Sequence, residues 1–483
     1  MKKVNILNDR YHIKSSKNQK TLLSLHFRIL QLMRIHFIAI GGSAMHNLAL
    51  ALHAKGYQIT GSDDVIFEPS KGRLAAKGLL PETFGWFPEK ITTDLDAIIL
   101  GMHAKPDNAE LLKAQELGVT IYSYPEFLYE QSKYKTRVVI GGSHGKTTIT
   151  SMILHVLNYH DIAVDYMVGA QLEGFETMVH LTEENDFIIL EGDEYLSSPI
   201  DRRPKFHLYK PNIALLSGIA WDHINVFPTY ENYVEQFQIF VDSITKGGSI
   251  NYNEEDAEVV KVVEASENPI RKLSYKTPEY IIENGQTLLL TPDGYMPVEI
   301  FGKHNLNNLA GAKWICQHIG VDEEDFYEAI ATFKGASKRL EKIAEHKMTV
   351  VYKDFAHSPS KVKATTNAVK EQYKDRTVLA CLELHTYSSL SAEFLKEYKG
   401  ALDAADKAVV FYSPHAVQIK QLEKVSEAQI AQAFEREDLI IYTDPAAFKN
   451  YLFSQNLDNT ALLLMSSGNY GGLDFNEFKQ HIH

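Results

Sequence analysis

The chain has 483 residues, of which 45% are hydrophobic and 23% charged, a composition typical of folded globular domains rather than of disordered chains. Its 49 basic and 62 acidic side chains leave a net charge of −13, which argues against a protein that coats nucleic acid. The two cysteines, Cys316 and Cys381, exclude a disulfide framework and a cysteine-based zinc site, and they favour a reducing, cytoplasmic location. No run of about 18 apolar residues occurs, so we expect no membrane span.

The first 32 residues differ from the rest in charge, because they carry seven basic side chains and one acidic side chain, Asp9. The stretch from Leu22 to Leu32 is interrupted by polar residues, and no small-residue cleavage site follows it, which is not the pattern of a signal peptide. The first clear strand begins directly after Met33. We therefore interpret residues 1–32 as a disordered arm or a mis-assigned start.

Three blocks follow, each beginning with an apolar strand that ends in glycine, and we place their boundaries at residues 33–134, 135–334 and 335–483. Strands alternate with helical stretches, which is the pattern of a parallel sheet covered by helices on both faces. In chain order, the clearest expected strands are residues 34–42, 57–60, 97–100, 137–140, 187–190, 213–216, 349–352, 377–382, 408–411 and 460–465, and the clearest helices are residues 45–55, 149–157 and 305–318.

One region of the second block departs from this alternation. Residues 246–303 contain short apolar stretches separated by turn residues, such as Pro292, Asp293 and Gly294, and they favour antiparallel strands. The whole pattern predicts an α/β protein of three domains.

The strongest local signal is the segment from Gly141 to Thr148, in which a strand runs into a glycine-containing loop and then into a helix. Glycines let backbone N–H groups face phosphate oxygens, and the helix N-terminus adds partial positive charge. Lys146 can neutralise the charge of a β- or γ-phosphate, and the Thr147 hydroxyl can bind Mg²⁺. The strict pattern requires glycine at Ile140, so a chance glycine–lysine turn remains the alternative.

Acidic side chains follow the next strand of this block. Glu191, Asp193 and Glu194 stand just beyond its carboxyl end, where ligands of open α/β sheets collect, and His223 follows another strand. Mg²⁺ takes oxygen ligands and keeps several waters, so these residues predict a magnesium site beside the phosphate loop. A solvated acidic loop and a histidine with purely structural partners are the alternatives.

The first block carries a weaker nucleotide signal. Gly41 and Gly42 follow its first strand, and Asp63 lies 22 residues after Gly41, close to the spacing of an acid that binds a ribose. Ala39 and Ala44 stand where the fingerprint has glycine, so the pattern is incomplete. A nucleotide and a nucleotide sugar both fit this pattern, and so does a turn without a ligand.

Further candidates lie in the second and third blocks. Asn305 and Asn308 fall on one face of a predicted helix, where amides can pair with an adenine edge or cap the helix. Arg339 follows a hinge at Gly335, and residues 354–359 stand at a strand end. In isolation, each of these features favours a structural role.

In one order along the chain stand the motifs Gly-x-x-Gly-Lys-Thr-Thr, Glu-x-Asp-Glu, Asp-His, His-Asn-x-x-Asn, Arg-Leu-Glu and Asp-Phe-x-His-x-Pro. This set resembles the ATP-dependent Mur ligases of bacterial cell-wall synthesis, and the resemblance runs from Met33 to the end of the chain. It implies a Rossmann-like N-terminal domain that binds a UDP-sugar, a P-loop NTPase-like central domain that binds ATP, and a Rossmann-like C-terminal domain that binds an amino acid or peptide.

The resemblance implies ATP and Mg²⁺ as cofactors, and a reaction in which the carboxylate of UDP-N-acetylmuramate attacks the γ-phosphorus of ATP and the acyl phosphate then reacts with an amine. It implies Lys146, Glu191, His223 and His357 as catalytic residues, with Thr147, Glu191 and His223 around the metal. The nucleotide contacts that it implies are Gly141, Ser143, His144, Gly145, Lys146, Thr147, Thr148, Asn305, Asn308, Arg339 and Asp354. The substrate contacts that it implies are Gly41, Gly42, Ser43, Met45, Asp63, His103, Arg203 and His385.

Two segments, residues 201–206 and 465–472, resemble the murein peptide ligase branch of the family, and they favour the tripeptide L-alanyl-γ-D-glutamyl-meso-diaminopimelate as the amine substrate. Residues 381–387 instead resemble the UDP-N-acetylmuramate–L-alanine ligase branch, so L-alanine is the alternative. Departures from the family motifs at Lys353, Ser358 and Thr386 are the basis of a third reading, a non-catalytic nucleotide-binding protein on the same scaffold. We expect a monomer or homodimer without nucleic-acid or membrane partners.

Overall fold

The computed structural model describes residues 33–482 apart from 173, 337–338, 421–422 and 424. The arm predicted at residues 1–32 lies outside the described residues. By compactness the chain divides into two units, Met1–Tyr124 and Pro125–His483. Within the described part of both units, every helix is too short or too polar to cross a membrane.

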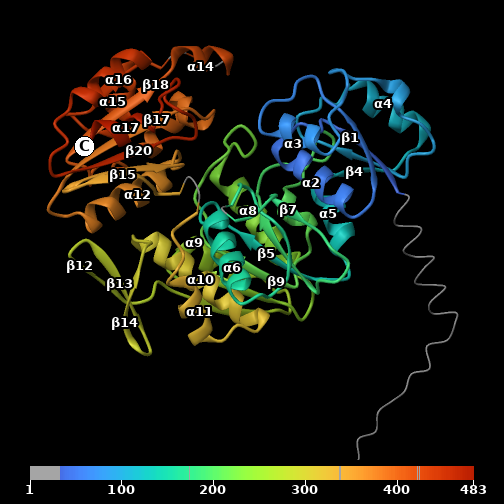
Figure 1. Cartoon of the computed structure of the whole chain (residues 1–483), viewed down its shortest axis with the longest axis horizontal. Helices are drawn as coiled ribbons and strands as arrows, with labels where there is room; N and C mark the ends of the chain where they lie inside the picture. The colour runs from blue at the N-terminus through green and yellow to red at the C-terminus, as the bar shows by residue number, and fades with distance from the viewer. Residues whose placement is uncertain (1–32, 173, 337–338, 421–422, 424, 483) are drawn as a thin grey trace, which may run out of the picture. The chain divides into compact units, whose positions relative to one another are not determined.

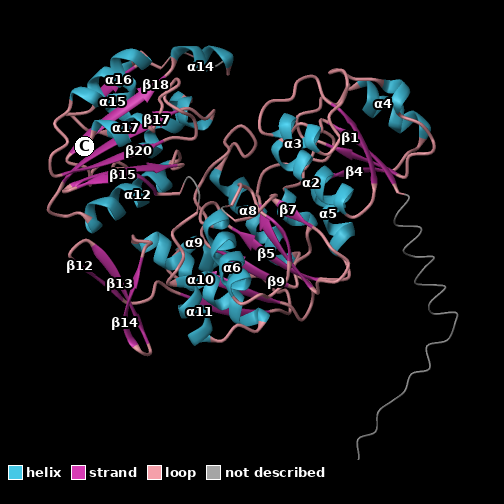
Figure 2. Cartoon of the chain, in the orientation of Figure 1, coloured by secondary structure: helices cyan, strands magenta, loops and turns pink. Residues whose placement is uncertain are grey.

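The first unit is built on one parallel sheet with helices between its strands (Figures 1 and 2). Its elements are β1 (Arg34–Ile38), α2 (Ser43–Ala54), β2 (Gln58–Ser62), α3 (Ser70–Ala76), the 3₁₀ helix η1 (Pro88–Lys90), β3 (Ala97–Leu100), α4 (Ala109–Leu117) and β4 (Ile121–Ser123). The four strands lie in the order β2-β1-β3-β4. β1 pairs in parallel with both β2 and β3, so the carboxyl ends of these three strands lie at one edge of the sheet. Gly41, Asp63 and His103 follow the strands at that edge, where open α/β sheets bind ligands.

The second unit contains a larger parallel sheet in its first half. Its elements are α5 (Tyr124–Ser132), which begins at the unit boundary, β5 (Thr136–Gly141), α6 (Lys146–Tyr159), β6 (Asp165–Met167), β7 (Val179–His180), β8 (Phe187–Gly192), α7 (Lys205–Leu208), β9 (Ile213–Leu216), α8 (Tyr230–Asp242), β10 (Ser249–Asn253), α9 (Ala257–Ala265) and β11 (Arg271–Tyr275). The strand order is β11-β10-β9-β5-β8-β6-β7, and only β6 and β7 pair antiparallel. The phosphate loop after β5 and the acids after β8 therefore follow two neighbouring strands.

The prediction of antiparallel strands throughout residues 246–303 is wrong for its first half. β10 and β11 pair parallel and extend the main sheet, with α9 as the connection between them. The side chain of Asp256 caps α9 by accepting hydrogen bonds from two backbone N–H groups of its first turn. Only β12 (Tyr280–Glu283), β13 (Gln286–Thr291) and β14 (Gly294–Val298) form the expected antiparallel sheet. α10 (Lys303–Ile319) and α11 (Glu323–Ile330) complete this half of the unit.

The C-terminal part of the second unit is a six-stranded sheet in the order β15-β16-β20-β17-β18-β19 (Figure 1). It is parallel except for the pair β15–β16. Its elements are β15 (Glu341–His346), β16 (Thr349–Asp354), α12 (Pro359–Gln372), β17 (Thr377–Leu384), η2 (Ser388–Leu390), α13 (Ala392–Leu395), η3 (Lys396–Tyr398), β18 (Lys407–Tyr412), α14 (Pro414–Ile419), α15 (Glu427–Phe434), β19 (Ile440–Tyr442), α16 (Pro445–Ser454), β20 (Thr460–Met465) and α17 (Glu477–His481).

Alternating side chains divide the core of this sheet between its two faces. Along β16, Val350 and Tyr352 pack in one hydrophobic cluster, whereas Val351 packs in another. Successive residues of a strand point to opposite faces, so continuous apolar strands become buried on both sides only when helices cover both faces. The sheet is therefore rigid at its centre, and the residues just beyond the carboxyl ends of β16, β17 and β20 are free to carry function.

Candidate active site

The phosphate loop lies between the end of β5 and the start of α6. Gly142 has φ 135° and Gly145 has φ 79°, both in the left-handed region that glycine favours. A Cβ atom at Gly142 would lie 2.1 Å from the hydroxyl oxygen of Ser217, and one at Gly145 would lie 2.3 Å from the side-chain oxygen of Asn308. Glycine is therefore required at both positions, and the loop keeps its shape although Ile140 departs from the strict motif.

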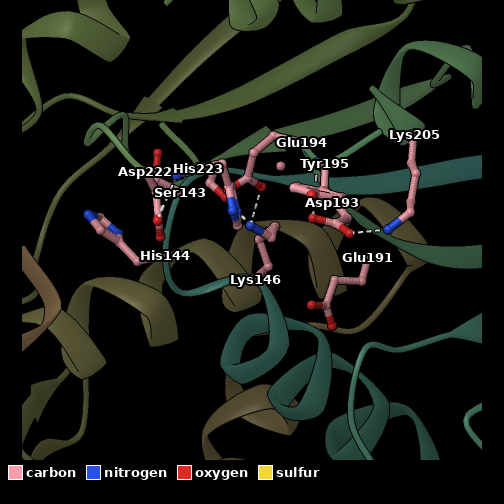
Figure 3. A network of polar contacts seen from close by, with 12 residues as sticks. Ser143, His144, Lys146, Glu191, Asp193, Glu194, Tyr195, Lys205, Asp222 and His223 are labelled. Carbon is pink, nitrogen blue, oxygen red and sulfur yellow. Dashed lines mark hydrogen bonds and ion pairs between the residues drawn. The ribbon is translucent and has the colours of Figure 1, made fainter. Parts of the chain in front are cut away.

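Lys146 folds back over this loop and reaches Glu194 (Figure 3). Its ammonium group donates hydrogen bonds to the carbonyl oxygen of Gly142 at 2.5 Å and to the carboxylate of Glu194 at 2.5 Å. Burial disfavours both charges, but their mutual attraction outweighs it, so the pKa of Lys146 lies above its ordinary value and the pKa of Glu194 lies well below. The loop thus holds a charged, nearly buried lysine next to its own backbone.

The first residue after Lys146 binds the first acid of the strand end. The Thr147 hydroxyl donates to Glu191 at 2.9 Å, and the backbone N–H of Gly169 donates to the other oxygen of that carboxylate at 2.8 Å. Burial raises the pKa of Glu191, although these donors and the charge of Lys146 oppose the shift. Thr147 and Glu191 therefore present two oxygen atoms at the base of the loop.

His223 lies next to Glu194, near the carboxylate oxygen that Lys146 does not contact, and not beside Glu191. Its Nε2 is 3.6 Å from Glu194 Oε1, and the Tyr233 hydroxyl donates to the same oxygen at 3.2 Å. Burial lowers the pKa of His223, but the carboxylates of Glu194 and Asp222 raise it above its ordinary value. The neighbouring Asp193 is bound by Lys205, as Figure 3 shows.

The donor set of this strand end suits a hard cation only in part. In the described portion of the chain, no three His, Cys, Asp or Glu side chains are grouped so that they can hold a metal ion. Thr147 and Glu191 are close enough to share one ion, and Mg²⁺ commonly takes one or two protein oxygens together with waters and substrate phosphates. The two residues therefore fit Mg²⁺, whereas a place for His223 in the same shell stays a prediction.

A cavity of about 640 Å³ opens above the loop, within the range of volumes found for small-molecule sites. Its walls combine Lys146 and Thr147 from the phosphate loop with Arg339, Asp354 and His357 from the C-terminal part of the unit. The predicted nucleotide residues that line it are Ser143, His144, Gly145, Lys146, Thr147, Thr148, Asn305, Asn308, Arg339 and Asp354, and Glu191 also lines it. Gly141 and His223 are not among the lining residues.

The predicted asparagines take two different positions. Asn308 lies against Gly145 of the loop, whereas the Asn305 amide donates to the carbonyl oxygen of Phe301 at 3.0 Å, one turn earlier in the chain. Asn308 therefore packs against the phosphate loop, and contact of either asparagine with adenine stays a prediction.

A polar group that sequence reasoning missed lies beside these asparagines. Asn307 donates to Asn253 at 3.0 Å and to Glu255 at 3.1 Å, and the Lys303 ammonium lies 2.9 Å from the same glutamate. Burial would raise the pKa of Glu255, but hydrogen bonds from Thr277 and Lys303 lower it to about 2. These residues lie at and after the carboxyl end of β10. The sequence pattern predicted antiparallel strands there, so it did not place a ligand-binding strand end at this point.

Asp354 organises the turn at the end of β16. Its carboxylate accepts hydrogen bonds from the backbone N–H of Phe355 at 2.8 Å and of Leu340 at 3.2 Å, and from the Thr365 hydroxyl at 2.6 Å. The Arg339 guanidinium lies over the Phe355 ring, 4.6 Å from its centroid. Both predicted residues thus face the cavity while they hold its C-terminal wall together.

Two histidines of the cavity are held neutral at pH 7. Burial, followed by the positive charge of Lys361, lowers the pKa of His144 to about 4 and that of His357 to about 4. The Nδ1 of His357 lies 2.8 Å from the carbonyl oxygen of Phe355, which fixes the ring orientation. Neutral imidazoles add no charge, so the lysines and the arginine set the positive charge of the walls.

The predicted UDP-sugar residues collect in the first unit. The Gly41 backbone N–H donates to Asp63 at 2.7 Å, and burial raises the pKa of that carboxyl. Met45 is buried, whereas Ser43 and His103 are exposed. The structure brings Gly41 and Asp63 together, and the contact of Asp63 with a ribose stays a prediction.

Arg203 and His385, which were predicted as substrate contacts, are not among the residues that line the cavity, whereas His357 is. Arg203 is exposed and pairs with Asp201 at 2.7 Å and with Glu126 at 3.2 Å. His385 is partly exposed, and its Nδ1 lies 3.6 Å from Glu383, whose second oxygen accepts the backbone N–H of Tyr470 at 2.8 Å. Residues 465–472, one of the two segments that favoured a tripeptide, and residues 381–387, which favoured L-alanine, therefore meet at the ends of β17 and β20, whereas residues 201–206 are not part of these contacts.

The three departures from the motifs have local partners. Lys353 lies over the Phe475 ring, 3.9 Å from its centroid, and the Thr386 hydroxyl donates to Ser389 at 3.0 Å. Ser358 is buried at the start of α12. These positions carry structural contacts in this chain.

Three family models match the chain: the catalytic domain of the Mur ligase family at residues 34–136, the Mur ligase middle domain at 140–316 and the Mur ligase glutamate ligase domain at 338–468. A curated UDP-N-acetylmuramate–L-alanine ligase from Sulfurihydrogenibium is 31% identical over 384 residues, which cover 78% of this chain and 82% of that protein. The chain therefore belongs to the Mur ligase family. The predicted three-domain α/β fold and the predicted class of enzyme, an ATP-dependent acid–amino-acid ligase, are confirmed.

Other relatives cover more of the chain. The UDP-N-acetylmuramate–L-alanine ligase of Carboxydothermus hydrogenoformans is 28% identical over 459 residues, which cover 92% of this chain and 95% of that protein. A solved murein peptide ligase from Psychrobacter arcticus has a TM-score of 0.63 at 22% identity, covering 93% of this chain and 98% of its own. A solved UDP-N-acetylmuramate-alanine ligase from Thermotoga maritima has a TM-score of 0.65 at 19% identity, with the same coverage. The two solved structures share the fold and do not separate the two branches.

Proposed function

We propose that this Mur ligase joins L-alanine to the carboxyl group of UDP-N-acetylmuramate and cleaves ATP to ADP and phosphate, the phosphate leaving the acyl phosphate when the amine attacks it. The observation that carries the proposal is the cavity in which the phosphate loop and Lys146 face Arg339, Asp354 and His357. The curated relatives from Sulfurihydrogenibium and Carboxydothermus are L-alanine ligases, and they support L-alanine over the tripeptide.

The reaction explains why a cation-rich cavity is needed. A carboxylate oxygen forms a bond to the γ-phosphorus while the bond to the ADP oxygen breaks and its electron pair leaves with ADP. Both reactants are anions, so they repel each other unless positive charge lies between them. In this proposal Lys146 and the N-terminus of α6 offset that charge, and Arg339 adds to it from the C-terminal wall.

Thr147 and Glu191 would hold Mg²⁺, which would supply positive charge against the phosphates. The chain's own part is to hold the oxygens of Glu191 and Thr147 in fixed, buried positions. His357 lines the cavity as a neutral imidazole with a pKa of about 4, which makes it a weak base, so its part in this proposal is to orient the amine by a hydrogen bond.

The tripeptide L-alanyl-γ-D-glutamyl-meso-diaminopimelate is the second candidate for the amine. The segment at residues 465–472, which resembles the murein peptide ligase branch, folds directly onto Glu383 beside His385. This arrangement supports a role of the segment in the choice of amine, and the tripeptide prediction itself rests on the sequences of residues 201–206 and 465–472.

The test is phosphate release with ATP, Mg²⁺ and UDP-N-acetylmuramate, together with either L-alanine or the tripeptide. Faster release with L-alanine is the expected result, and faster release with the tripeptide would transfer the assignment to the second candidate. Reactions that lack the UDP-sugar, and the variant Lys146→Met, are the controls. If neither amine stimulates phosphate release above these controls, the ligase proposal fails, and the result favours a non-catalytic nucleotide-binding protein.

A further inference from the structure

Lys361 stands in the first turn of α12, a helix labelled in Figure 1, and it is one of the residues that line the cavity. Its ammonium nitrogen lies 3.5 Å from Asp222 Oδ2, and its side chain is 25% exposed. Neither the motifs of the sequence nor the proposed reaction assigns it a role. Asp222 comes from the loop after β9, so the contact joins two parts of the chain that are 139 residues apart.

The ion pair of Lys361 is looser than those of the other lysines in the cavity wall. Lys146 lies 2.5 Å from Glu194, and Lys303 lies 2.9 Å from Glu255. A contact of 3.5 Å between charged groups is at the limit of a hydrogen bond. The Lys361 ammonium is therefore the lysine charge of this wall that is held most weakly by its acid.

Two buried histidines lie within the electrostatic reach of the Lys361 ammonium group. Lys361 and Lys146 both act electrostatically on the buried imidazole of His144, and Lys361 also acts on His357. Lys361, His144 and Lys146 all line one cavity, so both ammonium groups face the space beside the phosphate loop. A lysine in such a loop reaches the β- and γ-phosphates of a nucleotide, so a second ammonium that faces the same cavity from the C-terminal wall is placed toward the γ-phosphate end.

We propose that Lys361 is a second lysine that contacts the terminal phosphate of ATP, and that Asp222 holds it in place when no nucleotide is bound. The inference rests on the proposed function only in taking ATP as the ligand. A triphosphate extends one phosphate further than a diphosphate, so its γ-phosphate reaches a position that the terminal phosphate of ADP does not occupy. Lys361 therefore makes the site prefer ATP to ADP, and it supplies charge from the C-terminal wall where the γ-phosphoryl group is transferred.

A purely structural reading assigns Lys361 to the ion pair with Asp222 alone. The two readings predict different results for two substitutions. Lys361→Met removes the ammonium and the ion pair, whereas Asp222→Asn removes the ion pair and keeps the ammonium. If the pair only fastens two parts of the fold, both variants change nucleotide binding to the same degree.

The experiment is equilibrium binding of Mg²⁺ complexes of the β,γ-imido analogue of ATP and of ADP, which requires no amide formation. We expect Lys361→Met to weaken binding of the triphosphate analogue by about tenfold or more, because a charge-assisted hydrogen bond is lost, with less than about a twofold change for ADP. Lys361→Arg, which keeps the charge, should retain more of the affinity, and Asp222→Asn should leave it unchanged or increase it. The matched control is Lys363→Met, an exposed lysine of the same helix.

Equal weakening for both nucleotides in Lys361→Met, or the same loss in Lys361→Met and Asp222→Asn, would overturn the inference. The proposed function fails differently, through the absence of amine-dependent phosphate release from a protein that still binds nucleotide. Thermal unfolding of each variant, measured without nucleotide, separates a loss of folding from a loss of contact. A protein that binds neither nucleotide would overturn both.

Discussion

Two turns of this chain share one topology and carry opposite charges. After β1, the backbone N–H of Gly41 donates to the Asp63 carboxylate at 2.7 Å. After β5, the carbonyl oxygen of Gly142 accepts from the Lys146 ammonium at 2.5 Å. In each case a strand, a glycine turn and a helix follow one another, but an anion closes the first turn and a cation closes the second.

In both turns the topology determines where a ligand site lies, but it does not determine which ligand binds there. Both turns stand at the carboxyl ends of parallel strands, where open α/β sheets bind ligands. The turn after β1 is suited to hydrogen-bond donors such as ribose hydroxyl groups, because the Asp63 carboxylate in it is a hydrogen-bond acceptor. The second is suited to phosphate, because Lys146 and the start of α6 add positive charge. Four predictions test this difference.

The largest effect is expected for Lys146→Met. Loss of the ammonium removes charge where phosphoryl transfer needs it, and charged groups of this kind contribute about 10³–10⁵-fold to the rate. We expect amine-dependent phosphate release to fall by that order. The control is Lys205→Met, which removes the neighbouring partially exposed pair with Asp193 and should change the rate little. A loss of less than tenfold in Lys146→Met would mean that the second turn does not bind the triphosphate.

The second prediction concerns Glu194, the anion that balances the second turn. Glu194→Gln leaves the nearly buried Lys146 without its partner, so the free energy of unfolding should fall by about 3–5 kcal/mol. The double variant Lys146→Met/Glu194→Gln should recover part of this loss, because it leaves no unpaired charge. Urea unfolding measures both, and equal midpoints for the single and double variants would contradict the coupling.

The pH dependence of the same variant has a definite sign. The folded-state pKa of Glu194 lies below its ordinary value of 4.5, so its contribution is present above that pH and is lost as pH falls through the folded-state pKa. The wild type should therefore lose stability on acidification below about pH 4.5, and Glu194→Gln should show a flatter profile there.

The third prediction concerns the packing of the first turn. A Cβ atom at Gly41 would lie 2.8 Å from Ile66 and 2.9 Å from the Asp63 carboxylate, whereas one at Gly42 would find its nearest neighbour, Met45, at 3.5 Å. Gly41→Ala should therefore destabilise the first unit by about 1–3 kcal/mol, and Gly42→Ala should be nearly neutral. Thermal unfolding compares the two, and a larger loss for Gly42→Ala would refute the steric argument.

The smallest effect is expected for the histidines beside the second turn. The pKa of His144 and that of His357 lie at about 4, with burial as the first cause and Lys361 as the second. Both imidazoles should stay neutral throughout a titration from about pH 5.5 to 8 followed by NMR. Lys361→Met should raise both pKa values, whereas Lys363→Met should leave them unchanged, and protonation near pH 6.5 in the wild type would contradict the burial argument.

The sequence by itself determined the strands and the chemistry of the loop that follows β5. The strands expected at 187–190, 213–216 and 460–465 occur at or within one or two residues of those bounds, as β8, β9 and β20. Apolar runs that end in glycine and alternate with helical stretches depend on neighbours along the chain, so their pattern is legible without a structure. The glycines and Lys146 of the phosphate loop are legible for the same reason.

The tertiary structure alone decided which residues meet. Three contacts join segments that are far apart in the chain. Asn308 lies against Gly145, Asp222 lies beside Lys361, and His223 lies next to Glu194. The pairing of β10 with β11 was predicted wrongly for the same reason, because parallel pairing requires a crossover that turn residues do not specify. Local sequence patterns encode local conformation, whereas burial and charge pairing arise only when distant segments pack together.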